Sequence, residues 1–193
     1  MGRTSGATAG ADHGAAPSRF VALLRGVNVG GRTLPMQHLR DLFAALGYLD
    51  VATYIQSGNV LFRAERDDRQ TMADEIRAAI DAAIGHRVTV VLRTPPDLER
   101  VIAANPYADR DATKPLYVTF LADPPDAELL GRLDAVAGHP DEFRVVDREV
   151  YVWCPRGYGR TVLSNDFFER RLKVAATTRN WRTVTTLAAL AGG

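Results

Sequence analysis

The chain has few of the residues that build several common kinds of site. It contains a single cysteine, Cys154, which excludes an internal disulfide. Because Cys154 follows Val152 and Trp153 in a strand-like run, a buried structural thiol is favoured over a nucleophile. The four histidines show no spacing typical of zinc ligands, and we therefore expect no metal site.

Long hydrophobic runs are also missing. No stretch approaches the roughly 18 apolar residues that a membrane-spanning helix needs, so we expect no membrane partner. Residues 1–17 are small and polar and lack the apolar centre of a secretory signal, which predicts a flexible tail and a cytoplasmic location. The composition, with 46% hydrophobic and 24% charged residues, is that of an ordinary globular protein.

Lysine is scarce, and arginine carries nearly all of the positive charge. The lysines are Lys114 and Lys173, and the formal net charge is +1. Positive charge is nevertheless concentrated in residues 144–182, where nine basic residues stand against four acidic ones. Guanidinium groups bind phosphate and carboxylate bidentately. An anion-binding surface and an arginine-favouring genome both explain this pattern.

The order of the expected elements predicts an α+β protein made of two ferredoxin-like subdomains. In the first half, apolar periodicity and turn residues predict strands at 19–25, 51–55, 60–62 and 87–92 and helices at 35–46 and 68–84. In the second half they predict strands at 116–121, 142–146 and 149–153 and helices at 97–104, 126–137, 165–172 and 181–191. The first half is βαββαβ, and the second is βαββα with an extra helix.

This order predicts three parts of the chain. They are a tail at 1–17, a first subdomain at 18–94, and a second subdomain with a C-terminal helix at 95–193. No residue-level repeat joins the two halves, so the duplication rests on element order. One continuous mixed sheet is the alternative.

A first polar cluster, RGVNVGGR at residues 25–32, follows the first strand. Its glycines let the backbone approach a ligand, and Arg25 and Arg32 supply charged donors. The loop contains neither GxxxxGK[ST] nor GxGxxG and so matches no common phosphate-binding fingerprint. A turn that needs flexible residues explains it equally well.

Two further clusters lie at element ends. One is a turn between two strands, made of Tyr54, Ser57, Gly58 and Asn59, which a hairpin alone also explains. The other opens the last helix and comprises Thr178, Arg179, Asn180, Trp181 and Arg182. A helix N-terminus flanked by arginines favours an anion, whereas a Thr178 or Asn180 cap beside a buried Trp181 is the structural interpretation.

Together the three clusters predict one pocket for a phosphate-bearing ligand, a nucleotide or a nucleic acid. Tyr54 and Trp181 are suited to stack on a base. The candidate ligand-binding residues are Arg25, Gly26, Asn28, Gly30, Gly31, Arg32, Tyr54, Ser57, Gly58, Asn59, Thr178, Arg179, Asn180, Trp181 and Arg182.

At these same residues the chain resembles the family known as domain of unknown function 1697. The resemblance is carried by LLRGVNVGG, TYIQSGNV and TTRNWRTV, which occur in the family's order between Phe20 and Leu190. It implies an α/β protein with ferredoxin-like subdomains, in agreement with the element order. It implies no established activity.

Two other functions stay open. An enzyme acting on a small anionic substrate is one, although the acids are scattered and no catalytic residue or cofactor is indicated. His38 is a candidate base, but a surface position on a helix explains it as well. The other is a structural protein whose polar clusters tie the two lobes together, for example by pairing Arg25 or Arg179 with an acid. The sequence leaves the oligomeric state open.

Overall fold

The computed structural model describes residues 16–27, 34–55, 58–110, 115–133 and 141–193. Its first sheet has four antiparallel strands in the order β2-β3-β1-β4. These strands are β1 (Ser18–Arg25), β2 (Leu49–Tyr54), β3 (Asn59–Ala64) and β4 (Thr89–Arg93). Residues of β1 and β4 are buried on both faces, as expected of a nearly unbroken apolar run.

The second sheet repeats this arrangement in the order β6-β7-β5-β8. Its strands are β5 (Leu116–Leu121), β6 (Glu142–Val146), β7 (Glu149–Trp153) and β8 (Ala176–Asn180). The sequence prediction was wrong about β8, which it treated as part of a loop and helix cap. The second half is therefore also βαββαβ, followed by a helix, and the architecture is consistent with two ferredoxin-like subdomains.

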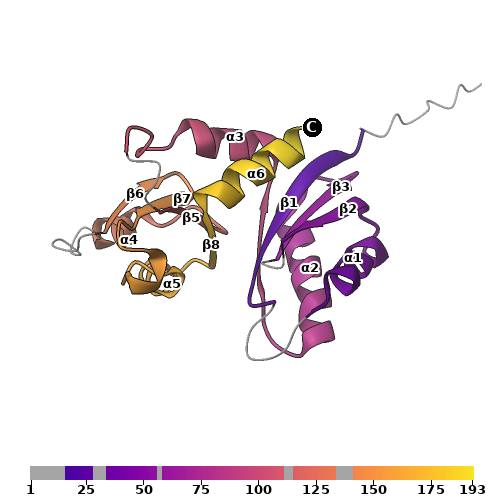
Figure 1. The fold of residues 1–193 in the computed structure, drawn as a ribbon. Coiled ribbons are helices and arrows are strands. Elements are labelled where there is room, and N and C mark those ends of the chain that lie inside the picture. Colours follow the sequence, from indigo (N-terminus) through magenta and orange to yellow (C-terminus); the bar gives the residue numbers. More distant parts are fainter. Residues whose placement is uncertain (1–15, 28–33, 56–57, 111–114, 134–140) are drawn as a thin grey trace, which may run out of the picture.

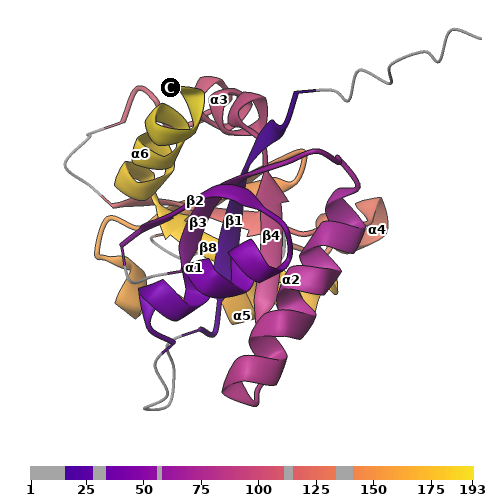
Figure 2. The same ribbon diagram turned by 90° about the vertical axis from the view of Figure 1, so that its right-hand side faces the viewer.

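Helices α1 (Met36–Ala45) and α2 (Arg69–Ile84) cover one face of the first sheet, as Figure 2 shows. Their buried residues share a core with the sheet and fall at helical spacing: Leu39, Phe43, Met72, Ile76 and Ile80. Asp68 caps the start of α2, and Gly85 ends it in the left-handed conformation with φ 73°. We call this sheet with α1 and α2 the first lobe.

The second lobe consists of the second sheet with α4 (Ala127–Gly131), the 3₁₀ turn η2 (Tyr158–Arg160) and α5 (Asn165–Leu172). These elements bury Phe168 and Leu172 against the sheet in a separate core. The helix expected at 126–137 is shorter, because α4 ends at Gly131, and residues 134–140 lie outside the described part of the chain.

Helices α3 (Pro95–Ala103) and α6 (Trp181–Gly192) pack against each other and span the two lobes (Figure 1). Their apolar residues join a central core to which both sheets contribute; Val21 and Val91 come from the first sheet, Val118 and Phe120 from the second. The expected boundary at residue 94 coincides with the cap of α3, and it stays a prediction. The shared core shows that the lobes do not pack as independent bodies.

The two lobes have the same strand order, with β1, β2, β3 and β4 of the first matched by β5, β6, β7 and β8 of the second. In the first sheet Val21 lies opposite Arg93, and in the second Val118 lies opposite Arg179. Each of these arginines comes directly before a helix cap, Thr94 for α3 and Asn180 for α6. Arg93 and Arg179 therefore occupy equivalent positions.

Candidate functional site

Arg179, a predicted ligand-binding residue, joins the second lobe to the first. Its Nε donates to Asn59 Oδ1 at 2.6 Å, and its Nη2 donates to the carbonyl oxygens of Leu24 at 2.7 Å and Gly58 at 3.2 Å. Its Nη1 donates to Thr177 Oγ1 within its own strand. Burial lowers the pKa of Arg179 to about 10, so the guanidinium keeps its charge at neutral pH. This side chain is 8% exposed, which favours a structural tie over a ligand contact.

Arg93 makes the reciprocal tie from the first lobe to the second. Its Nε donates to Glu149 Oε1 at 2.9 Å, and its Nη2 donates to the carbonyl oxygen of Leu121 at 2.7 Å. Glu149 opens β7 as Asn59 opens β3, so the two arginines reach matching places in the opposite lobe. Burial raises the pKa of the Glu149 carboxyl above its ordinary value, against the opposing effect of Arg93.

Arg25 supplies a third tie nearer the surface. Its guanidinium pairs with Asp166 and, at 2.6 Å, with Glu169, both on α5 of the second lobe. Glu169 also accepts a hydrogen bond from the backbone of Ala176, which orients its carboxylate. Arg25 thus has the acidic partners that the structural alternative requires.

Replacing Arg25 by alanine is expected to lower the free energy of unfolding by about 1 kcal/mol, because its side chain is 35% exposed and solvent screens the pair. Urea titration measures this loss, which should shrink at high salt. A loss of several kcal/mol that does not depend on salt would contradict a screened surface tie.

The other predicted residues are divided among different places. Gly58 and Asn59 lie at the Arg179 tie, and the carbonyl oxygen of Gly26 accepts a hydrogen bond from His86 Nε2 at 2.6 Å. Tyr54 lines a hollow beside the C-terminal end of α6. Another hollow, at the start of α6, is lined by Asn180, Trp181 and Arg182.

Thr178 lines neither of these hollows. It forms hydrogen bonds with Asn165, Tyr158 and Thr119 within the second lobe. Five predicted residues lie outside the described part of the chain: Asn28, Gly30, Gly31, Arg32 and Ser57.

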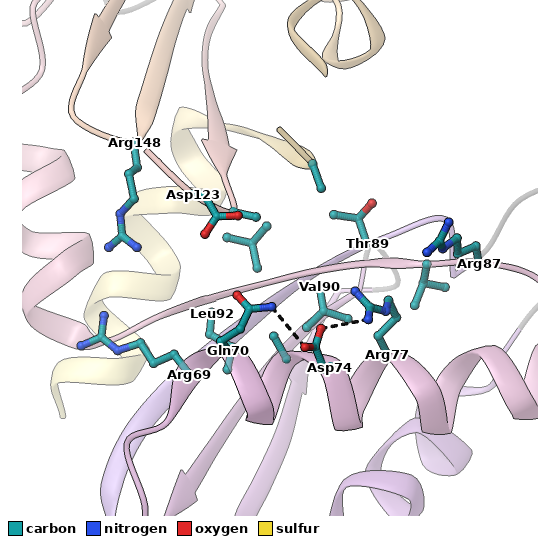
Figure 3. A pocket seen from close by; sticks show the side chains of 15 residues that line it. Arg69, Gln70, Asp74, Arg77, Arg87, Thr89, Val90, Leu92, Asp123 and Arg148 are labelled. Atoms are coloured by element: carbon teal, nitrogen blue, oxygen red, sulfur yellow. Dashed lines mark hydrogen bonds and ion pairs between the residues drawn. The ribbon is translucent and has the colours of Figure 1, made fainter. Parts of the chain in front are cut away.

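A groove that the sequence did not indicate lies between the lobes and has a volume of about 650 Å³ (Figure 3). We call it the inter-lobe groove. The first lobe lines it with α2, Arg87 and residues 88–92, and the second lobe with Ala122, Asp123, Arg148 and Ala175. Figure 3 shows Arg148 and Asp123 on the side opposite the α2 side chains.

Four arginines line the inter-lobe groove: Arg69, Arg77, Arg87 and Arg148. Arg69 is held by Asp97 at 2.9 Å, and Arg77 is held by Asp74 at 2.9 Å. Arg87 and Arg148 have no ion pair or side-chain hydrogen bond among the residues that the structure describes. The groove therefore offers two uncommitted guanidinium groups, one from each lobe, beside two that acids already orient.

Local sequence patterns do not indicate this groove, because its arginines are far apart in the chain. Arg148 belonged to the basic stretch at 144–182, which was the available signal. Arg69 and Arg77 sit on the outer side of α2, where charged residues are usually solvated. Only the packing of the lobes brings them near Arg148.

A comparison with known families matches residues 18–151 to a family described as "Protein of unknown function (DUF1697)". The chain belongs to this family. The matched residues run from β1 into β7, so the TTRNWRTV stretch of β8 and α6 lies beyond them. No curated protein matches the chain.

Among solved structures, the conserved bacterial protein SP0830 from Streptococcus pneumoniae is similar to this member of the DUF1697 family. The TM-score is 0.73 at 19% sequence identity, over 92% of this chain and 100% of that chain. At this identity the likeness concerns the fold.

The described residues lack a metal-binding cluster and a membrane-spanning helix. They contain no group of three or more histidine, cysteine, aspartate or glutamate side chains placed to hold a metal ion. Within the same residues, no helix has both the length and the apolar character to cross a bilayer. Cys154 is buried, and burial raises its pKa to about 11, which opposes a role as thiolate nucleophile.

Proposed function

We propose that this protein binds a phosphate-bearing ligand, a nucleotide or a nucleic acid, in the inter-lobe groove. The observation that carries the proposal is the pair Arg87 and Arg148, whose guanidinium groups line one groove from opposite lobes without a partner in the described chain. Guanidinium groups form short, charge-assisted and bidentate hydrogen bonds to phosphate oxygens. A ligand anion would supply the partner that neither guanidinium has among the described residues.

The acids of the groove favour a ligand that carries hydroxyl or amino groups as well as phosphate. Asp74 is already engaged by Arg77 and by Gln70, whose Nε2 donates to it at 3.2 Å. Asp123 is exposed at the opposite wall and can accept from a hydroxyl group such as that of a ribose. Donors and an acceptor on facing walls suit a nucleotide better than a simple inorganic anion.

The inter-lobe ties support a structural role for the polar clusters of Arg25 and Arg179. Arg93 and Arg179 each cross from one lobe to buried acceptors in the other. We propose that these ties fix the width of the groove, while Arg87 and Arg148 contact the ligand. The two roles are compatible because the residues differ.

Binding of ATP and of a fluorescently labelled single-stranded oligonucleotide tests the proposal, by calorimetry and by anisotropy at low salt. Wild type is expected to bind at least one probe, with affinity that falls as salt rises. Arg87→Ala and Arg148→Ala should each weaken binding about tenfold, the effect of losing one hydrogen bond to a charged group.

Arg132→Ala and Arg156→Ala are the matched controls, because both arginines are exposed and neither lines the groove. They should leave the affinity within about twofold of wild type if phosphate is held in the groove. Failure of every probe to bind, or equal weakening by groove and control variants, rules the proposal out.

A further inference from the structure

A hollow of about 520 Å³ lies at the start of α6, between the end of β7 and the segment that follows α3. Its lining is rich in aromatic rings: Tyr107, Tyr117, Trp153 and Trp181. The chain has two tryptophans, and both line this one hollow. It shares no lining residue with the inter-lobe groove.

Three of the four aromatic rings pack against another ring that holds them in place. Tyr107 and Trp153 stack with ring centroids 6.0 Å apart and are almost completely buried. Tyr117 packs against Tyr158 with centroids 4.5 Å apart. The wall is therefore rigid, and a planar ligand would gain contact area without ordering loose side chains.

Positive charge stands at the rim of this aromatic wall. Arg182 is exposed, and its guanidinium has no side-chain partner in the part of the chain described here. Arg110 already has partners: its Nη2 pairs with Glu142 Oε2 at 3.2 Å, and its Cζ lies 5.9 Å from the centre of the Tyr107 ring. Arg182 is thus the rim cation that a bound anion can engage.

The aromatic lining is not imposed by the fold, because the equivalent place in the first lobe is different. Leu116 lies opposite Trp153 in the second sheet, and the corresponding pair in the first sheet is Arg19 opposite Arg63. Arg19 donates to the carbonyl oxygen of Ala191, and Arg63 donates to that of Pro17. The first lobe thus places bonded arginines where the second presents apolar surface.

We infer that this hollow binds a planar aromatic ring that carries a carboxylate or phosphate group. The ring lies against the aromatic lining, and the anionic group forms charge-assisted hydrogen bonds with Arg182. A volume of this size falls in the range of small-ligand sites. The site does not depend on ligand binding in the inter-lobe groove.

Intrinsic tryptophan fluorescence tests this site directly, because both tryptophans line it. Benzoate and AMP are the anionic probes, and benzyl alcohol and adenosine are their neutral counterparts. We expect saturable quenching or a spectral shift with at least one anion, and about tenfold weaker response with its neutral counterpart. A response to benzoate alone identifies a carboxylate site, and a response to AMP alone identifies a phosphate site.

Arg182→Gln should reduce the affinity for the anion to that of the neutral counterpart, and this exposed substitution leaves the core intact. Arg170→Gln, on the surface of α5, is the matched control and should bind as wild type does. Arg148→Ala should also leave the response unchanged, which separates this site from the groove. No saturable change with either anion, or no effect of Arg182→Gln, overturns the inference.

Discussion

Replacing Arg179 by alanine is expected to lower the free energy of unfolding by about 3–5 kcal/mol, because the change strips several buried acceptors of their donor. The carbonyl oxygen of Leu24 and the Asn59 side chain lose hydrogen bonds of 2.7 Å and 2.6 Å in an interior that water does not reach. Urea unfolding followed by circular dichroism measures the loss.

Two further variants show whether the loss comes from the inter-lobe tie. Arg179→Lys keeps the charge but lacks the planar fork, so it should recover part of the stability. Arg170→Ala removes an exposed arginine from the same lobe and should change stability by less than about 0.5 kcal/mol. Near-wild-type stability of Arg179→Ala would show that the residue does not hold the lobes together.

Arg93→Met is expected to lower the free energy of unfolding by about 3–5 kcal/mol at neutral pH, because it leaves the Glu149 carboxylate buried without its cation. Removing Arg93 raises the pKa of Glu149 further above its ordinary value of 4.5. A carboxyl with a higher pKa in the folded state destabilises the fold above that pKa, and this effect fades as pH falls toward the unfolded value. The loss of unfolding free energy relative to wild type should therefore be largest near pH 7 and smaller near about pH 5.

Unfolding of Arg93→Met and of Arg93→Met/Glu149→Leu across this pH range measures both effects. The double variant should regain most of the lost stability, because two apolar side chains of similar volume leave no unpaired charge. Its deficit should also lose most of its dependence on pH. A deficit in Arg93→Met that stays constant with pH would show that the Glu149 charge is not its cause.

Local sequence signals predicted most of the fold. Gly85 and Asp68 mark the ends of α2 by known capping preferences, and Asn180 was one of the two caps expected for α6. Strand β8 was missed because its residues are threonine and arginine rather than alternating apolar side chains. Thr177 and Arg179 are buried there by tertiary hydrogen bonds, which no local pattern reveals.

The candidate site was harder to predict for a related reason. An arginine near a glycine-rich loop looks the same in a sequence whether its donors face a ligand or a carbonyl of the other lobe. Arg179 proved to face Leu24 and Gly58, whereas Arg148, in a plain hairpin turn, lines the inter-lobe groove. Which arginine keeps free donors depends on how two distant segments pack, and that information is not local.

The reciprocal inter-lobe hydrogen bonds of Arg93 and Arg179 have a consequence for how the chain holds together. Each half contains a complete set of strands and helices. Each half also supplies one buried arginine whose guanidinium donates to a backbone carbonyl oxygen of the other half. If the chain were cut between the two halves and the fragments separated, each fragment would have an arginine without its acceptors and carbonyl oxygens without their donor. The halves resemble the subunits of an obligate dimer that a peptide link has made permanent.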